Sequence, residues 1–130
     1  SLSSSFAGIT FNTQSKYNSG GVYTHSTSSN SEQITLNETG DYEVSTDITF
    51  DATSGTIDPC EVRLSLAGSA VNGATSYTYV GSTFADKSTV SMTRIISAVA
   101  GNVLSVEGRV TSGGAQALAG GCRVTVRKLS

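Results

Sequence analysis

Charged residues are scarce in this 130-residue chain. Asp, Glu, Lys and Arg make up 14% of it, with eight basic against ten acidic residues and a net charge of −2, whereas an average domain has about a quarter. A groove for DNA or RNA needs clustered Lys and Arg, and only Arg123, Arg127 and Lys128 approach a cluster, in a segment that also carries apolar residues. The composition therefore argues against a nucleic-acid partner.

Long hydrophobic runs are also missing. No apolar run reaches the roughly 18 residues of a membrane span, and the N-terminal residues SLSSSFAG have neither the basic start nor the apolar centre of a signal peptide. We therefore expect a soluble protein with no membrane partner and no secretion signal. Because Ser1 is a residue after which an initiator Met is readily removed, we also expect a complete short gene product, although a trimmed fragment would look the same.

Long helical patterns are absent too, and Pro occurs once. Instead, 14 Gly separate short apolar runs at intervals of roughly 8 to 15 residues, which is typical of an antiparallel sandwich or barrel. We predict one all-β domain over residues 1–130. The expected strands are Phe6–Asn12, Gly21–Thr24, Ser31–Leu36, Asp41–Phe50, Glu61–Ala67, Ser76–Val80, Thr89–Val99, Val103–Val110 and Gly121–Lys128.

The clearest strand is Asp41–Phe50, where apolar and polar residues alternate with a period of two and predict one buried face. The same parity assigns further residues to the core: Ile9, Phe11, Ile34, Leu36, Val62, Leu64, Leu66, Leu104, Val106, Val124 and Val126. Asn72-Gly73 predicts a two-residue hairpin turn, and Ala100-Gly101-Asn102 a second tight turn. The Gly-rich segment Thr111–Gly121 is expected to be a loop, exposed or packed against a neighbouring subunit.

The order of several short motifs resembles a known family. GDYEV at residues 40–44 opens a long strand, VRLSL follows at 62–66, SMTRII at 91–96 and AGNVLSV at 100–106, before a closing apolar strand. This order resembles the tumour necrosis factor and C1q-like jelly-roll family, in particular its bacterial and phage branch. The resemblance covers nearly the whole chain. It implies a ten-strand, two-sheet sandwich that forms a homotrimer.

The resemblance also implies which surface meets the partner subunits. It places the first strand, the last strand and Asp41–Phe50 in the sheet that faces the trimer axis. Because the last two would be antiparallel neighbours, Glu43 and Asp47 are expected to pair with Arg123 and Arg127. We predict that these four residues lie at or near the trimer interface; the alternative is an ordinary solvated strand face.

The two cysteines are candidates for a disulfide. Cys60 precedes the Glu61–Ala67 strand, and Cys122 starts the last one. The family topology places the end of Asp41–Phe50 and the beginning of the last strand at the same end of the sandwich, so the two sulfurs could meet. A bond across so long a loop would contribute about 4 kcal/mol in the chain-entropy model. The alternative is two separate buried thiols, which a reducing cytoplasm would favour.

Other candidate sites are weaker. Asp47, Asp51 and Asp58 are oxygen ligands that could hold calcium, but they lack the spacing of a calcium loop, so we expect no cofactor and no metal. His25, the single histidine, lies among hydroxyls with Glu32 downstream, and no G-x-S-x-G motif accompanies it; we expect no catalysis. Asn37-Glu38-Thr39 fits a glycosylation pattern but reads more simply as a turn.

The sequence thus predicts a non-enzymatic trimer on a virion surface, most simply a phage capsid decoration protein whose partners are its own copies and the major capsid protein. The alternative is a head domain of a phage tail fibre, or of a bacterial collagen-like surface or spore protein, which binds a receptor or a cell-surface glycan. For the second reading, aromatic side chains that could stack on sugars are the candidates: Tyr17, Tyr23, Tyr77 and Tyr79.

Overall fold

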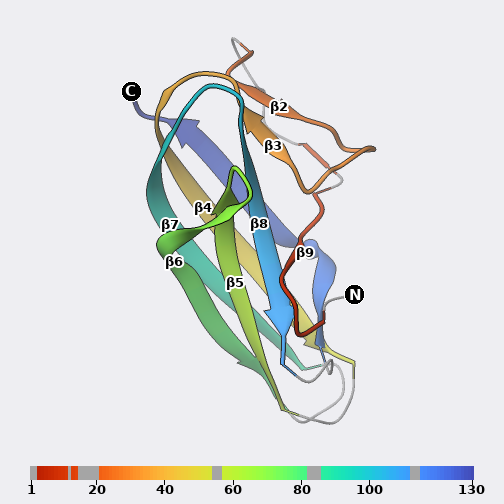
Figure 1. The fold of residues 1–130 in the computed structure, drawn as a ribbon. Helices are drawn as coiled ribbons and strands as arrows, with labels where there is room; N and C mark the ends of the chain where they lie inside the picture. The colour runs from red at the N-terminus through yellow and green to blue at the C-terminus, as the bar shows by residue number, and fades with distance from the viewer. Residues whose placement is uncertain (1–2, 12, 15–20, 54–56, 82–85, 112–114) are drawn as a thin grey trace.

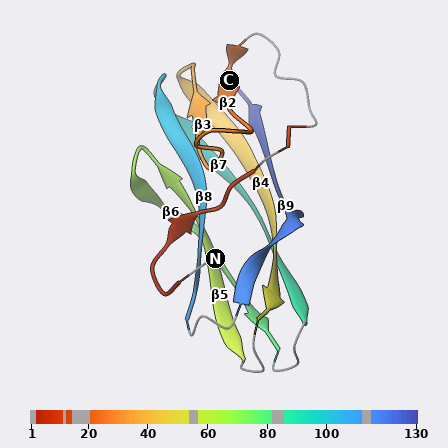
Figure 2. The ribbon, with the colours of Figure 1, turned by 90° about the vertical axis from the view of Figure 1, so that its right-hand side faces the viewer.

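Strands dominate the fold and form two antiparallel sheets that face each other as a sandwich (Figures 1 and 2). The computed structural model describes residues 3–11, 13–14, 21–53, 57–81, 86–111 and 115–130. The strands in these residues are β1 (Ala7–Gly8), β2 (Tyr23–His25), β3 (Ile34–Leu36), β4 (Gly40–Ala52), β5 (Asp58–Leu66), β6 (Ser69–Val80), β7 (Lys87–Ala98), β8 (Asn102–Val110) and β9 (Ala115–Lys128). The all-β prediction is confirmed.

The sheets differ in size. The six-stranded sheet has the order β2-β3-β8-β5-β6, with β1 paired to β8, and the three-stranded sheet has the order β7-β4-β9. Strands β4 and β9 are antiparallel neighbours, as expected. The expected place of the first strand was wrong, because β1 pairs with Gly108 and Glu107 in the larger sheet and not with the last strand.

The core lies between the sheets and follows the period-two pattern. Every second residue of β4, from Tyr42 to Ala52, is buried, and Tyr42 and Phe50 are among the largest fully buried side chains. Of the predicted core residues, only Leu66, Val124 and Val126 remain partly exposed. Leu66 ends β5 at a hairpin, and the two valines belong to β9, the edge strand of the smaller sheet, where a neighbouring strand is missing on one side.

The turn between β5 and β6 differs from the prediction. Ala67 and Gly68 form it, with φ of 53° and 83°, as a two-residue hairpin turn requires. Asn72-Gly73 lies instead inside β6, where the pairing shifts from Ser65↔Ala70 to Arg63↔Thr75. Gly73 has a φ of 74°, so the positive-φ tendency of this dipeptide is used in a bulge and not in the turn.

The Gly-rich segment before the last strand is also different from the prediction. Strand β9 begins at Ala115, which pairs with Ala52, so the strand starts six residues before its predicted start at Gly121. The pairing of β9 with β4 is irregular at the glycines. Cys122 pairs with Ile48 and Ala117 with Phe50, and Gly120 between them has a φ of 81°. A bulge of this kind lets a Gly-rich segment continue a strand.

The predicted turn at Ala100-Gly101-Asn102 is confirmed. It joins β7 to β8, and Gly101 has a φ of 93°. The backbone N–H of Asn102 donates to the carbonyl of Val99 at 3.0 Å, and the backbone N–H of Val99 donates to the side-chain Oδ1 of Asn102 at 2.9 Å. This reciprocal pair of hydrogen bonds explains why Asn follows the glycine.

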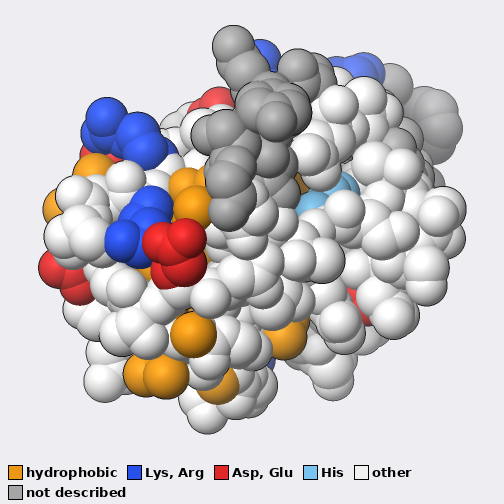
Figure 3. Space-filling model, turned by 90° about the horizontal axis from the view of Figure 1, so that it is seen from above, with side chains coloured by type: hydrophobic (Ala, Val, Ile, Leu, Met, Phe, Trp, Pro, Cys, Tyr) orange, Lys and Arg blue, Asp and Glu red, His pale blue; other side chains and the backbone are white. Residues whose placement is uncertain are grey.

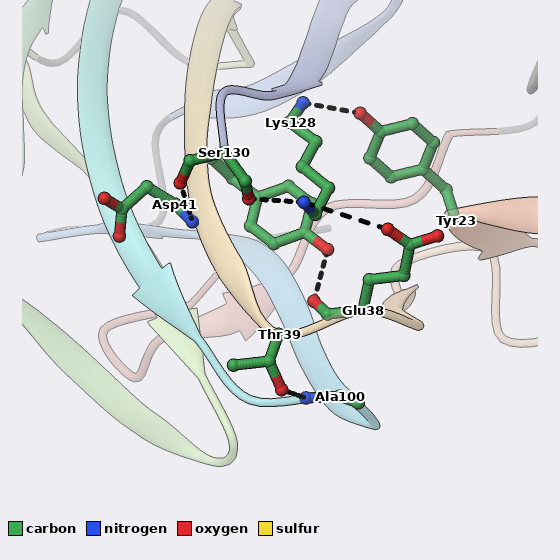
Figure 4. Close-up of polar contacts among 8 residues, drawn as sticks. Tyr23, Glu38, Thr39, Asp41, Ala100, Lys128 and Ser130 are labelled. Atoms are coloured by element: carbon green, nitrogen blue, oxygen red, sulfur yellow. Dashed lines mark hydrogen bonds and ion pairs between the residues drawn. The ribbon is translucent and has the colours of Figure 1, made fainter.

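A cluster of polar contacts holds the C-terminal end of β9 (Figure 4). The backbone nitrogen of Lys128 donates to the Tyr23 hydroxyl at 2.7 Å, and Nζ of Lys128 lies 3.8 Å from a carboxylate oxygen of Glu38 and contacts Ser130. In addition, the Tyr42 hydroxyl donates to the Glu38 carbonyl at 2.5 Å. Burial raises the pKa of Tyr42, which keeps this hydroxyl protonated as a donor. The cluster ties β2 and the start of β4 to the last strand.

Candidate functional site

The outer surface of the three-stranded sheet, here called the polar face, carries the side chains that alternate with the buried ones on β4, β7 and β9. It is rich in hydroxyl and charged groups, and it also carries the apolar side chain of Ile95, which is 65% exposed. Its members are Asp41, Glu43, Ser45, Asp47, Thr49, Asp51, Lys87, Thr89, Ser91, Thr93, Ile95, Ser97, Gln116, Arg123, Thr125 and Arg127.

The four residues predicted from the charge pattern are brought together on this face. Register pairs Glu43 with Arg127 and Asp47 with Arg123 across β4 and β9. The Arg127 Nη2 lies 3.1 Å from Glu43 Oε1, and the Arg123 Nη2 lies 3.8 Å from Asp47 Oδ2. The arginines are 67% and 81% exposed, so each pair contributes only about 0.2–1 kcal/mol to the fold of a single copy.

Hydroxyl groups pair on the other side of β4, across to β7. Ser45 and Thr93 are 3.1 Å apart, and Thr49 and Thr89 are 2.7 Å apart, between side-chain oxygens. Ser91 donates to Asp47 at 2.6 Å, so this carboxylate is held from both neighbouring strands. Rows of hydroxyl groups therefore alternate with rows of ion pairs along the face.

A further hydroxyl continues the pattern toward the end of the sheet, where Ser97 donates to Oδ1 of Asp41 at 2.7 Å. The charges are unevenly distributed across the strands: the central strand β4 carries carboxylates, while the edge strand β9 carries arginines. The polar groups of this face are thus largely hydrogen-bonded to each other before anything binds. Such an arrangement is suited to contact with another surface, because buried polar groups are tolerated when they are paired.

The predicted ligand-binding tyrosines are not assembled into one site. Tyr77 and Tyr79 are 66% and 64% exposed on β6, an edge strand of the other sheet. Tyr23 instead packs edge-on against Tyr42, with ring centroids 6.1 Å apart, and its hydroxyl receives the Lys128 bond. Tyr17 lies outside the described residues.

The disulfide prediction was wrong, because Cys60 and Cys122 are free thiols. The prediction took Cys122 as the start of the last strand, but β9 begins seven residues earlier, so Cys122 lies within the strand, opposite Ile48. Cys60 lies in the other sheet, opposite Val110 and Thr78. The Cys122 thiol donates to the carbonyl of Leu118 at 3.5 Å.

Both thiols are poor nucleophiles. Burial, reinforced by the charge of Asp58, raises the pKa of Cys60 to about 12. Burial likewise raises the pKa of Cys122 above its ordinary value. Because the thiolate is the reactive form, these cysteines act as small apolar core residues.

The three calcium candidates do not converge. Asp47 and Asp51 belong to the outward row of β4, and Asp47 is engaged by Ser91 and Arg123. Asp58 is fully buried on β5 of the opposite sheet. Within the described part of the chain, no group of three His, Cys, Asp or Glu side chains could hold a metal ion.

His25 holds neighbouring segments together. Its Nδ1 lies 3.3 Å from Oε1 of Gln14, and its Nε2 lies 3.0 Å from the carbonyl of Ser31. Glu32 packs against Gly8, where an added Cβ would come within 2.8 Å of the Glu32 side chain. The contacts of His25 are those of a residue that positions β2.

The side chains of the glycosylation pattern are also engaged. The Asn37 amide donates to the Gly21 carbonyl and to the Thr24 hydroxyl, at 2.8 Å each. The Thr39 hydroxyl accepts a bond from the backbone nitrogen of Ala100 at 3.0 Å (Figure 4). These contacts support the interpretation of the segment as a structured turn before β4.

A scan against protein-family models finds no matching family, and a search of the curated proteins finds no match. In the residues that the structure describes, no helix has the length and apolar character needed to cross a membrane.

Proposed function

We propose that this chain is a non-enzymatic structural subunit that assembles into a homotrimer through its polar face. The observation that carries the proposal is the division of charge on that face. Carboxylates line the central strand β4, and Arg123 and Arg127 line the neighbouring edge strand β9. The basic edge of one copy therefore complements the acidic strand of the next copy.

The homotrimer is the closed form of such an assembly. An interface that joins one patch to a different patch closes into a ring when its rotation allows, and otherwise it continues as a filament. Three copies related in this way bury Ile95 together with side chains that are already paired. The desolvation cost is therefore smaller than for free charges.

The order of the strands supports a jelly-roll assignment. From β3 onward, the chain passes repeatedly between the sheets, so that β3-β8-β5-β6 face β9-β4-β7. This order agrees with the sheet partition implied by the tumour necrosis factor and C1q-like resemblance, with the exception of β1. The resemblance is to a family of trimers, which is consistent with a trimer built on the β4 sheet.

We infer that the trimer is a virion surface protein and that it stabilises a phage capsid as a decoration protein, with the major capsid protein as its partner. A small rigid sandwich adds buried area to neighbouring capsomers without chemistry. The surface is suited to an exposed particle: Figure 3 shows one end of the molecule, where charged side chains form small groups and uncharged polar and backbone atoms cover most of the view. The alternative role is a receptor- or glycan-binding head of a tail fibre or bacterial surface protein.

Co-sedimentation separates these roles. The purified chain is mixed with empty phage capsids, with host cells, or with neither, and the pelleted fraction is measured. Decoration predicts saturable binding to capsids at a fixed number of trimers per particle and a higher melting temperature of the particle. Binding to cells without binding to capsids would replace this role with receptor recognition.

A further inference from the structure

The outer surface of the six-stranded sheet carries two aromatic side chains side by side. Tyr77 and Tyr79 are both outward residues of β6, about 7 Å apart along the strand, and roughly two-thirds of each is exposed. Large exposed aromatic pairs are uncommon on a surface that is otherwise polar, and they mark contact sites. Tyrosine rings offer a flat apolar face together with a hydroxyl group.

An ionic cluster adjoins this pair on the same surface. Glu61 of β5 is the register partner of both Tyr77 on β6 and Arg109 on β8. The Arg109 Nη2 lies 3.0 Å from Glu61, and one register step along, Nε of Arg63 lies 2.8 Å from Oε1 of Glu107. Two carboxylates thus balance two guanidinium groups, and the surface beside the tyrosines has no net charge.

Phe6 fixes the far side of the cluster. Its ring centroid lies 3.8 Å from Cζ of Arg63 and 4.5 Å from Cζ of Arg109, so both guanidinium groups stack against one aromatic ring. The four charged side chains are only 18–40% exposed. Their hydrogen-bonding groups are therefore held in place beside the two exposed tyrosine rings.

We propose that Tyr77, Tyr79 and the Glu61–Arg109 pair form a binding site for a neutral saccharide. A pyranose ring presents an apolar C–H face that packs on an aromatic ring, while its hydroxyls both donate and accept hydrogen bonds. The tyrosines supply the stacking surface, Glu61 supplies an acceptor and Arg109 supplies donors in the same row. A neutral ligand matches the balanced charge of the site, whereas a polyanion would need uncompensated cations.

This site is independent of the proposed trimer. It lies on the six-stranded sheet, on the opposite side of the sandwich from the polar face. A failure of saccharide binding would therefore leave the assembly proposal intact, and the reverse also holds.

The test uses the full chain labelled with ¹⁵N and titrated with maltohexaose, cellohexaose and mannohexaose, followed by amide chemical shifts. At least one of these sugars is expected to shift the amides of β5 and β6 in a saturable way. Tyr77→Ala and Tyr79→Ala should each weaken that binding by roughly two- to tenfold, while Tyr77→Phe retains stacking and most of the affinity. Val99→Ala removes an equally exposed apolar side chain elsewhere (63% exposed) and should change nothing.

Three results would overturn the proposal. One is the absence of amide shifts on β5 and β6 with all three sugars at 10 mM, a concentration roughly equal to the dissociation constant of the weakest binding of interest. Another is binding that Tyr77→Ala and Tyr79→Ala leave unchanged. The third is a change in solution mass on replacing these tyrosines, which would assign the pair to contact between copies of the chain.

Discussion

Arg127 and Glu43 are separated by 84 positions in the sequence, yet Nη2 of the first lies 3.1 Å from Oε1 of the second on register-paired positions of β9 and β4. The pair stands on the polar face, where Asp47 and Arg123 repeat it farther along the same strands. In the proposed trimer, the arginines also reach the acidic strand of the neighbouring copy, which makes these charges determinants of assembly more than of folding.

Reversing one charge separates these two roles. Arg127→Glu places a carboxylate opposite Glu43 and should dissociate the trimer, while the unfolding free energy of the single copy falls by only about 1 kcal/mol or less, because the pair is exposed. Light scattering measures the first effect and urea unfolding of the monomer the second. The double variant Glu43→Arg with Arg127→Glu restores opposite charges and should recover the trimer; a single variant that stays trimeric would remove this pair from the interface.

The cysteines allow a direct chemical check. Because both are free thiols, Ellman's reagent should titrate two thiols per chain in urea without prior reduction, and a reductant should leave the melting temperature unchanged. In the folded protein, Cys60 should react far more slowly, since it is fully buried and mostly protonated. Finding no thiol in the unfolded, unreduced chain would instead show a disulfide.

The raised pKa of Cys60 also predicts how stability depends on pH. In the unfolded chain the thiol ionises near its ordinary value of about 9, while in the folded chain it stays protonated up to about 12. The unfolded state therefore loses protons first, and the unfolding free energy falls as pH rises through this window, by up to roughly 1.4 kcal/mol per pH unit. The stability that is linked to the protonated Cys60 thiol is fully present below pH 9 and is lost as the pH rises toward 12.

Cys60→Ala isolates that contribution from other alkaline titrations. The variant loses core packing and should be less stable than the natural chain at pH 8. The difference should shrink at pH 10.5, because there the thiol of the natural chain ionises only on unfolding, which stabilises its unfolded state. Urea unfolding at both pH values gives the comparison. A stability difference that is the same at both would contradict the assigned pKa.

The β5–β6 turn offers a stabilising change. Ala67 has a φ of 53°, a left-handed conformation that costs an L-residue with a Cβ roughly 1 kcal/mol. Ala67→Gly or Ala67→Asn should recover much of this and raise the melting temperature by about 3–5 °C. Gly68→Ala, at a φ of 83° with open space around its Cβ position, should lower it by a similar amount. Thermal unfolding of the three variants decides this, and equal melting temperatures would refute the turn geometry.

The sequence predicted those parts of the fold that local pattern determines. The alternation in β4 determines which of its residues are buried, and Gly101 with Asn102 specifies the turn between β7 and β8. The hairpin turn at Ala67-Gly68 could not be predicted, because Asn72-Gly73 has the stronger local preference for positive φ. Only the pairing of β5 with β6 places the turn at Ala67, which adopts a positive φ at a cost.

The sites were harder to predict because they depend on register between distant strands. The family resemblance suggested that β4 and β9 are neighbours, and the charge signs then suggested which residues pair. The hydroxyl partners on β7 required the alignment of Ser45 with Thr93. The cysteine prediction failed because β9 extends through a Gly-rich segment by pairing with the end of β4, a long-range interaction with no local signal. The row formed by Tyr77, Glu61 and Arg109 likewise comes from three strands.

The most direct test of trimer assembly is the solution mass of the purified chain at neutral pH and moderate salt, measured by light scattering. One copy has a mass of 13.3 kDa, so we expect a single species of three times that value, about 40 kDa, that dissociates on Arg127→Glu. A mass of 13.3 kDa at micromolar concentration would contradict assembly through the polar face.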